Sequence, residues 1–354
     1  MTQITVPGPA QAKQTAQAAQ TAVPKARDPF FDNAKYLAIL LVVIGHSIVG
    51  MRTTVEAAGG LYTFLHLFHM PLFIVITGYF SRTFSFSRRK AQRLLTNVGV
   101  PYVIFEVAYS LWEWHFNHKP TLEISLLNPI YLTWFLLALF LWRLSTPVWQ
   151  QIRWPLGVAV GISLLAYTAP LADDLEMHRV FGLAPFYVLG LCLRPEHFEV
   201  LRRRWARPVG AAVLAAAFAG SFWVKDRVDY RWFYWRDAHD QFGVGNLTGT
   251  AMRLAMMVTA LVLVAAFLAV VPRGRHWFTG LGAATIFSYL LHGFVIKYAQ
   301  FQEWDHAAFL QNGFGLVATV VFAVVLGTAL CTPPVRKIFR WAVEPRASWA
   351  FTRK

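Results

Sequence analysis

A few ionisable side chains lie inside long apolar stretches of this sequence. Titratable groups are costly in an apolar environment, so each of them is a candidate for chemistry. An imidazole can act as a general base near neutral pH, and a neighbouring carboxylate can orient or polarise it. The side chains concerned are His46, His69, Glu106 and His292.

His46 and Lys35 stand eleven residues apart in the stretch FDNAKYLAILLVVIGHS. A helix completes about three turns over that length, so both side chains share one face and lie about 16 Å apart along the axis. If this helix crosses a membrane, Lys35 would lie at the inner interface of the membrane and His46 in its outer half. The spacing fits equally a histidine that hydrogen-bonds a neighbouring helix and a lysine that only anchors the helix end.

His66 and His69 are three residues apart and so share a helix face. Histidine pairs at this spacing can ligate zinc. The neighbouring sequence offers no Asp, Glu or Cys to complete a ligand set, so we expect no metal. The alternative for His66 is a residue at the membrane interface.

The composition explains why these stretches are apolar. Hydrophobic residues make up 56% of the 354 residues and charged residues only 14%, too few to cover the surface of a soluble protein. Disordered, collagen-like and disulfide-based chains are excluded by the same composition. The net charge of +15 comes from basic residues in short segments between apolar stretches, which indicates membrane topology and not nucleic-acid binding.

We predict an all-α fold, a polytopic transmembrane helical bundle of about ten spans with both termini in the cytoplasm. Most apolar stretches approach the ~20 residues that cross a bilayer. Alternating crossings place Lys and Arg on every inner loop, which favours a crossing even for the short stretch 180–193 that contains Pro185. The stretches are roughly 34–50, 61–80, 98–114, 129–145, 155–170, 180–193, 207–224, 250–271, 281–299 and 314–332.

The two ends of the chain differ from the apolar middle. Residues 1–28 are rich in Ala, Gln, Thr and Pro and lack the apolar core of a signal peptide, so we expect a disordered cytoplasmic tail. Residues 29–340 form the transmembrane domain, and 341–354 a basic cytoplasmic tail. We expect a multi-pass protein of the cytoplasmic (plasma) membrane, with the lipid bilayer as its partner. The sequence leaves the oligomeric state open.

Three motifs resemble the integral-membrane acyltransferase 3 family, and most nearly its fucose O-acetylase-like branch. They are FDNAKYLAILLVVIGHS, then FHMPLFIVITGYFSR, then RRKAQRLL followed by PY, within a resemblance that covers 29 to about 340. The resemblance implies an enzyme that moves an acyl group from cytoplasmic acyl-CoA to a hydroxyl of an extracytoplasmic glycan. It implies that His46 is the motif histidine, and that Lys35, Lys90 and Arg93 bind the acyl-CoA.

On this basis we expect acetyl-CoA or another acyl-CoA as co-substrate, and a glycan, glycolipid or secreted glycoside as acceptor. His46 would act as general base, with an acyl-histidine intermediate as the alternative. Glu106 would orient His46, or else only hydrogen-bond across helices. Residues that could support the site or face the acceptor are Asp32, His69, His292, Trp235 and Asp237.

Two alternatives stay open at this point. The outer loop at about 225–249 combines aromatic and acidic residues, which suits stacking on sugars and equally suits an interfacial aromatic belt. Ten helices with intramembrane His and Glu would also fit a proton-coupled transporter or flippase. The two halves of the chain have no Gly- or Pro-broken segments at matching positions, which favours acyl transfer over transport.

Overall fold

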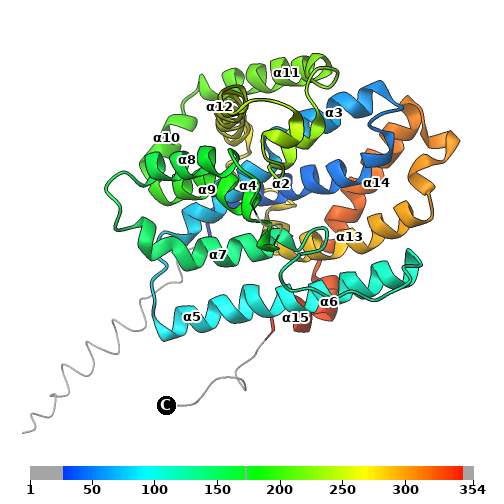
Figure 1. The fold of residues 1–354 in the computed structure, drawn as a ribbon, viewed down its shortest axis with the longest axis horizontal. Helices are drawn as coiled ribbons and strands as arrows, with labels where there is room; N and C mark the ends of the chain where they lie inside the picture. The colour runs from blue at the N-terminus through cyan, green and yellow to red at the C-terminus, as the bar shows by residue number, and fades with distance from the viewer. Residues whose placement is uncertain (1–26, 172–173, 346–354) are drawn as a thin grey trace, which may run out of the picture.

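The chain folds into a bundle of helices in the computed structural model (Figure 1). The structure describes residues 27–171 and 174–345, and these ranges contain no β-strand. The predicted all-α class is therefore confirmed. Nearly all of the predicted tail 1–28 lies outside the described residues, as does the predicted tail 341–354 beyond residue 345. Residues 341–343 belong to a helix.

Each of the ten apolar stretches overlaps a helical segment. Two of the segments are interrupted, one by a short break between two helices and the other by a π-helical turn at Leu95–Gly99. The segments are α2 (Pro29–Ser47), α3 (Glu56–His66) with α4 (His69–Ser81), α5 (Arg88–Leu94) with α6 (Val100–Phe116), α7 (Trp134–Trp149), α8 (Pro155–Ala166), α9 (Met177–Cys192), α11 (Ala206–Val224), α12 (Asn246–Val270), α13 (Thr285–Phe301) and α14 (Gly313–Leu330). Two shorter helices are α10 (Pro195–Leu201) and α15 (Pro333–Val343).

Five helical segments of the described chain are long and apolar enough to cross a membrane. They are Glu56–Ser81, Arg88–Phe116, Ala206–Val224, Asn246–Val270 and Gly313–Leu330. Helices α7 and α8 are apolar but shorter. Helix α9 runs for 16 residues with Pro185 inside it. Ten crossings and cytoplasmic termini thus stay predictions.

Helix α2 lies inside the bundle and packs on α4, α13 and α14 (Figure 1). Asp28 caps its start by accepting a hydrogen bond of 3.0 Å from Phe30 N, and Pro29 occupies the first helical position, where its missing N–H costs little. The helix runs without interruption from Lys35 to His46. The two residues therefore share one rigid element, as the sequence predicts.

Helices α4 and α9 approach each other closely through glycine. A Cβ atom at Gly78 would lie 2.1 Å from the carbonyl oxygen of Tyr187, and one at Gly190 would lie 2.3 Å from that of Val75. Small residues at such crossings let backbones pack tightly, as is common between membrane helices. Both helices contribute side chains to the cavity described next.

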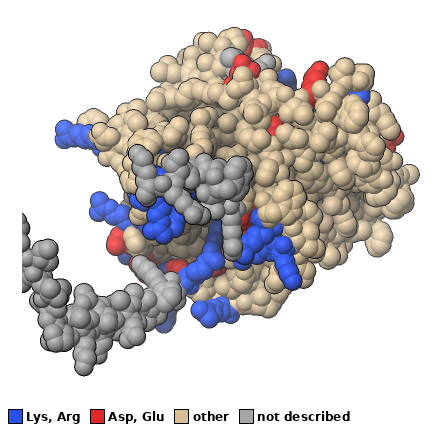
Figure 2. Space-filling view, turned by 90° about the horizontal axis from the view of Figure 1, so that it is seen from below, with Lys and Arg blue, Asp and Glu red and all other residues tan. Residues whose placement is uncertain are grey.

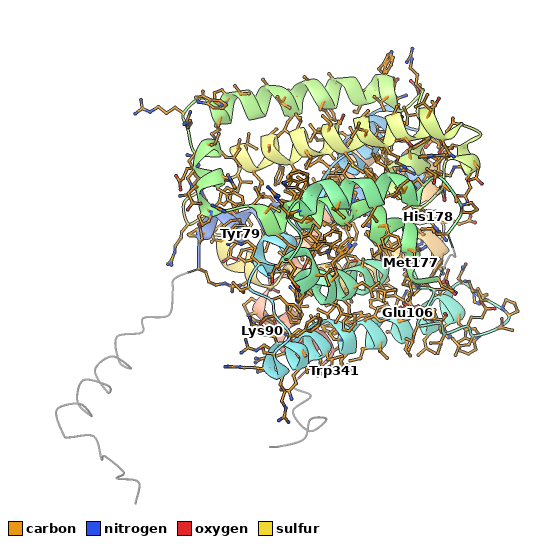
Figure 3. The ribbon with its side chains drawn as sticks, turned by 60° about the vertical axis from the view of Figure 1, so that its left-hand side comes forward. Tyr79, Lys90, Glu106, Met177, His178 and Trp341 are labelled. Atoms are coloured by element: carbon orange, nitrogen blue, oxygen red, sulfur yellow. The ribbon has the colours of Figure 1, made fainter. Side chains whose placement is uncertain are left out.

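One end of the molecule carries a cluster of basic side chains. In Figure 2 most of the visible Lys and Arg side chains gather at the left and the lower centre of the face, and the right-hand side carries few charges. Helix α15, which the sequence analysis did not predict, places Trp341 at the surface with 68% of its side chain exposed (Figure 3). Exposed Trp beside basic residues is typical of a helix at a membrane interface.

Candidate active site

A cavity of about 250 Å³ opens where α2, α3, α4, α9 and α13 meet two loops. Histidines, aromatic rings and two basic residues dominate its lining. The lining consists of His46, Val49, Tyr62, His66, His69, Met70, Tyr131, Trp134, Arg179, Leu183, Phe233, Tyr234, Trp235, Lys297 and Gln300. We refer to it as the outer cavity.

His46, near the end of α2, contacts the candidate residue His292 and also Tyr131, which was not predicted. Its Nδ1 lies 3.0 Å from the hydroxyl of Tyr131. Its ring centroid lies 5.5 Å from that of His292 on α13. Nε2 of His46 has no hydrogen-bond partner among the described residues. One ring nitrogen is thus engaged by the protein, and the other is available to a substrate.

The other histidines nearby are tied to backbone. The Nδ1 atom of His66 lies 2.8 Å from Tyr62 O, that of His69 lies 2.7 Å from Leu65 O, and that of His292 lies 2.8 Å from Ser288 O. A carbonyl oxygen only accepts, so Nδ1 carries the proton in all three neutral rings. The partner of His46 is a hydroxyl, which can donate or accept. Among these four histidines, His46 alone has a side-chain partner at Nδ1.

No third side chain joins the His66–His69 pair to make a possible metal-ligand group among the described residues. The two ring centroids are 4.7 Å apart in an edge-to-face arrangement. The described residues contain no group of three or more His, Cys, Asp or Glu side chains placed to hold a metal ion. Both rings instead line the outer cavity.

Glu106 lies on α6 with 1% of its side chain exposed (Figure 3). Its carboxylate accepts hydrogen bonds from Ile130 N, at 3.1 Å to each oxygen, and from Thr133 Oγ1 at 2.5 Å. Glu106 therefore makes no hydrogen bond to His46, although the triad-like hypothesis required one. Glu106 holds the turn that contains Tyr131, and Tyr131 makes the contact with His46.

A second cavity, of about 270 Å³, lies at the basic end, and we call it the inner cavity. It contains two of the three residues that the resemblance assigns to acyl-CoA, and it adds Arg143 from α7. Lys90 Nζ is held by Thr83 O and by Ser85 Oγ, the latter at 3.1 Å. The lining is Phe80, Ser81, Thr83, Phe84, Lys90, Arg93, Leu94, Asn97 and Arg143.

Lys35 lies next to the inner cavity without lining it. Its Nζ forms an ion pair of 2.7 Å with Asp32, one turn earlier on α2, and lies 5.8 Å from the ring centroid of Phe80 in the cavity wall. The predicted residues Asp32 and Lys35 are thus brought together. Both are far along α2 from His46, so Asp32 does not belong to the outer cavity.

The loop after α11 forms the roof of the outer cavity. Phe233, Tyr234 and Trp235 reach the cavity, whereas Asp237 does not line it. The hydroxyl of Tyr234 is hydrogen-bonded to that of Tyr62 on α3. Burial raises the pKa of Tyr234, which the bond to Tyr62 partly offsets, so the phenol stays neutral.

Arg253 of α12 ties this roof to the bundle. It is fully buried and donates to the carbonyl oxygens of Trp232 and Asp237, at 2.8 Å each. Its guanidinium carbon lies 3.9 Å from the ring centroid of Tyr167 and 4.6 Å from that of Trp232. Cation–π contacts of this kind are stronger when they are shielded from water.

Sequence reasoning missed four residues of the two cavities. Arg179 pairs with Glu176 at 3.2 Å, and Lys297 Nζ lies 4.8 Å from the ring centroid of Tyr131. Lys297 lies in an apolar stretch, so the criterion that selected His292 would also have found it. The same holds for Arg143, which lies near the end of the stretch 129–145. Tyr131 carries no such signal, because only the packing of distant segments gives it a role.

The comparisons with known proteins decide the family. The acyltransferase domain family matches residues 28–332. The chain belongs to this family. The predicted resemblance is thereby confirmed, and the protein is a membrane-embedded acyltransferase with several apolar helices.

A curated relative extends over nearly the same length. The nodulation protein NolL of Sinorhizobium fredii (strain NBRC 101917 / NGR234) is 26% identical in an alignment of 331 residues that covers 86% of this chain and 87% of NolL. No solved structure is significantly similar to the chain. The geometry of both cavities therefore comes from this structure alone.

Proposed function

We propose that this acyltransferase transfers an acyl group, most simply acetyl, from cytoplasmic acyl-CoA to a sugar hydroxyl across the membrane, with His46 as general base. The observation that carries the proposal is the state of the His46 ring. Nδ1 is engaged by Tyr131, and Nε2 has no partner among the described residues in a cavity lined by aromatic side chains. A base needs such a free nitrogen within reach of the substrate hydroxyl.

The inner cavity is the proposed site for the donor. Lys90, Arg93 and Arg143 line it, and Lys35 lies against its Phe80 wall. Arginine and lysine both bind phosphate, arginine through a planar fork and lysine as a point charge. CoA carries several phosphates, so this cluster suits its nucleotide end. The acyl end would then extend along α2 toward His46, about 16 Å from Lys35.

The proposed reaction is a single displacement. The acceptor hydroxyl gives its proton to His46 Nε2 while its oxygen bonds to the thioester carbonyl carbon. The carbon–sulfur bond then breaks, and the leaving thiolate of CoA takes the proton from the imidazolium. In the acyl-histidine alternative, Nε2 bonds to the acyl carbon while the carbon–sulfur bond breaks and the CoA thiolate leaves. The acceptor hydroxyl oxygen then bonds to the acyl carbon, the carbon–nitrogen bond to Nε2 breaks, and the hydroxyl proton passes to the CoA thiolate.

The roof of the outer cavity is the proposed acceptor side. Phe233, Tyr234 and Trp235 line it together with Trp134. Aromatic rings present flat apolar faces and polar edges, which suit the faces and hydroxyls of a sugar. A glycan, a glycolipid and a secreted glycoside all fit this chemistry. Membership of an acyltransferase family supports group transfer over transport.

The test uses inside-out membrane vesicles that contain the protein and labelled acetyl-CoA. We expect label in a glycan or lipid fraction for the wild type and none for His46→Ala. His115→Ala, which changes a histidine outside the lining of either cavity, is the matched control and should label normally. Label that is independent of His46 would overturn the proposal. Mass spectrometry of glycans from a deletion strain and its parent then identifies the acceptor.

A further inference from the structure

Tyr131 has a backbone conformation that side chains rarely adopt. Its φ is +50°, in the left-handed region, where a bulky residue is an outlier. Such a conformation persists only when the surrounding structure imposes it, and it is often found at functional sites. Tyr131 also lines the outer cavity.

Two helices hold the backbone of the Tyr131 turn. Glu106 on α6 accepts from Ile130 N on one side of Tyr131 and from Thr133 Oγ1 on the other. The carbonyl oxygen of Leu132, the residue after Tyr131, accepts from the hydroxyl of Tyr289 on α13. Among the described residues, the hydrogen bonds of the buried Glu106 carboxylate thus all go to this one turn.

The Tyr131 ring is also closely packed by neighbouring residues. Gly293 of α13 lies against it, since a Cβ atom there would be 2.9 Å from Tyr131 Cε1 and 2.3 Å from the hydroxyl oxygen of Tyr109. Tyr109 packs edge-to-face on Tyr131 with centroids 6.0 Å apart. Any side chain at position 293 would displace one of these two rings.

We propose that Tyr131 is the positioning residue for His46, and that Glu106 and Gly293 serve to hold Tyr131 in place. These contacts together position the Tyr131 hydroxyl, whose oxygen lies 3.0 Å from His46 Nδ1. When the phenol oxygen accepts from Nδ1–H, the ring is the tautomer with a free lone pair at Nε2. The opposite direction would leave Nε2 protonated and unable to act as a base.

This inference rests on His46 being the base, as proposed above. It assigns Glu106 a role different from that of a triad carboxylate, because Glu106 acts on His46 only through the Tyr131 turn. When Nε2 takes up the acceptor proton, the bond from Nδ1–H to the phenol oxygen becomes charge-assisted and therefore stronger. The Tyr131 hydroxyl keeps its own proton throughout.

Tyr131→Phe tests the contact, because it removes the hydroxyl and keeps the ring that fills the space. We expect kcat to fall about ten- to a hundredfold, the range for loss of a hydrogen bond to a charged group, with an unchanged KM for acyl-CoA. The control is Tyr102→Phe. Tyr102 is on the same helix as Glu106, and its hydroxyl donates to Leu126 O, in the same loop as Tyr131, at 2.6 Å. Removal of this hydroxyl should leave kcat unchanged.

Glu106→Ala and the double variant Glu106→Ala/Tyr131→Phe test whether the two residues act as one unit. If Glu106 acts through Tyr131, the double variant should be no slower than the worse single variant. Losses that multiply would show that Glu106 has a separate structural role. Glu106→Gln keeps an accepting oxygen for the turn, so it should recover part of the activity.

Two results would overturn the proposal. One is a wild-type kcat in correctly inserted Tyr131→Phe protein, and the other is a loss that falls mainly on the acyl-CoA KM. His46→Ala measured in parallel separates this inference from the proposed function. If that variant is active, the base assignment fails; if it is inactive while Tyr131→Phe is normal, only the positioning role fails.

Discussion

The outer and inner cavities hold their functional side chains in different ways. In the outer cavity each histidine has a fixed hydrogen-bond partner, and the residue beside His46 is held by two helices. In the inner cavity Arg93 is exposed and Lys90 rests on a loop. Proton transfer needs defined geometry, whereas a phosphate can also be bound by exposed charges. Under the proposed function, this difference would separate the chemistry from donor binding along α2.

The first prediction sharpens the comparison by asking whether the two cavities face opposite sides of the membrane. Single cysteines at Phe86 near the inner cavity and at Gln241 in the roof loop should react with an impermeant thiol reagent from opposite sides. The background needs Cys192→Ser, because Cys192 is exposed. Labelling of both positions from the same side would break the two-sided arrangement and the predicted topology.

The second prediction concerns the outer cavity. His46→Ala should reduce acyl transfer by about 10²–10⁴, the usual contribution of a general base, while the protein still inserts and folds. Rates must be compared at equal abundance in the membrane. Near-normal turnover would remove His46 from the mechanism and leave the outer cavity with a binding role only.

The third prediction concerns the inner cavity. Arg93→Gln should raise the acyl-CoA KM about ten- to a hundredfold, because a charge-assisted phosphate contact contributes roughly 1.5–3 kcal/mol. The acceptor KM should not change. Arg89→Gln is the matched control, since Arg89 is exposed on the same helix and does not line the cavity. Equal effects of the two substitutions would mean that these charges only set topology.

The fourth prediction is the smallest effect. Raising salt from 0.1 M toward 1 M shortens the screening length from about 10 Å to 3 Å, so exposed phosphate contacts weaken. We expect the wild-type acyl-CoA KM to rise several-fold, and the Arg93→Gln KM to rise less. A salt effect that falls on kcat would instead place the sensitive charges in the outer cavity, near Arg179 and Lys297.

The sequence predicted the features that depend on local pattern. The all-α class follows from apolar stretches that overlap the observed helices, and the shared face of Lys35 and His46 follows from helical periodicity on α2. The family follows from motifs in the first hundred residues, and the match over 28–332 confirms it.

Other features depend on contacts between distant segments and could not be predicted. Tyr131 lies 85 residues from His46 in sequence, in a loop whose left-handed backbone no local pattern indicates. The sequence analysis expected the Glu106 carboxylate to contact His46, but it contacts Thr133. The position of Glu106 in an apolar helix does not indicate which loop packs against that helix. Arg143 lines the inner cavity only because α7 packs beside the segment that contains Lys90 and Arg93, which no local pattern indicates.

The Arg253 tether has a consequence for acceptor selectivity. A loop of this length would ordinarily lose conformational freedom when it closes on a ligand, and that loss would weaken binding. Here a buried guanidinium holds the carbonyl oxygens of Trp232 and Asp237, so part of this freedom is already lost in the protein alone. With the roof as the acceptor side, as proposed, such preorganisation makes discrimination depend on the shape of Phe233, Tyr234 and Trp235. Exchanging these rings should change which acceptor is modified without altering how the donor is held.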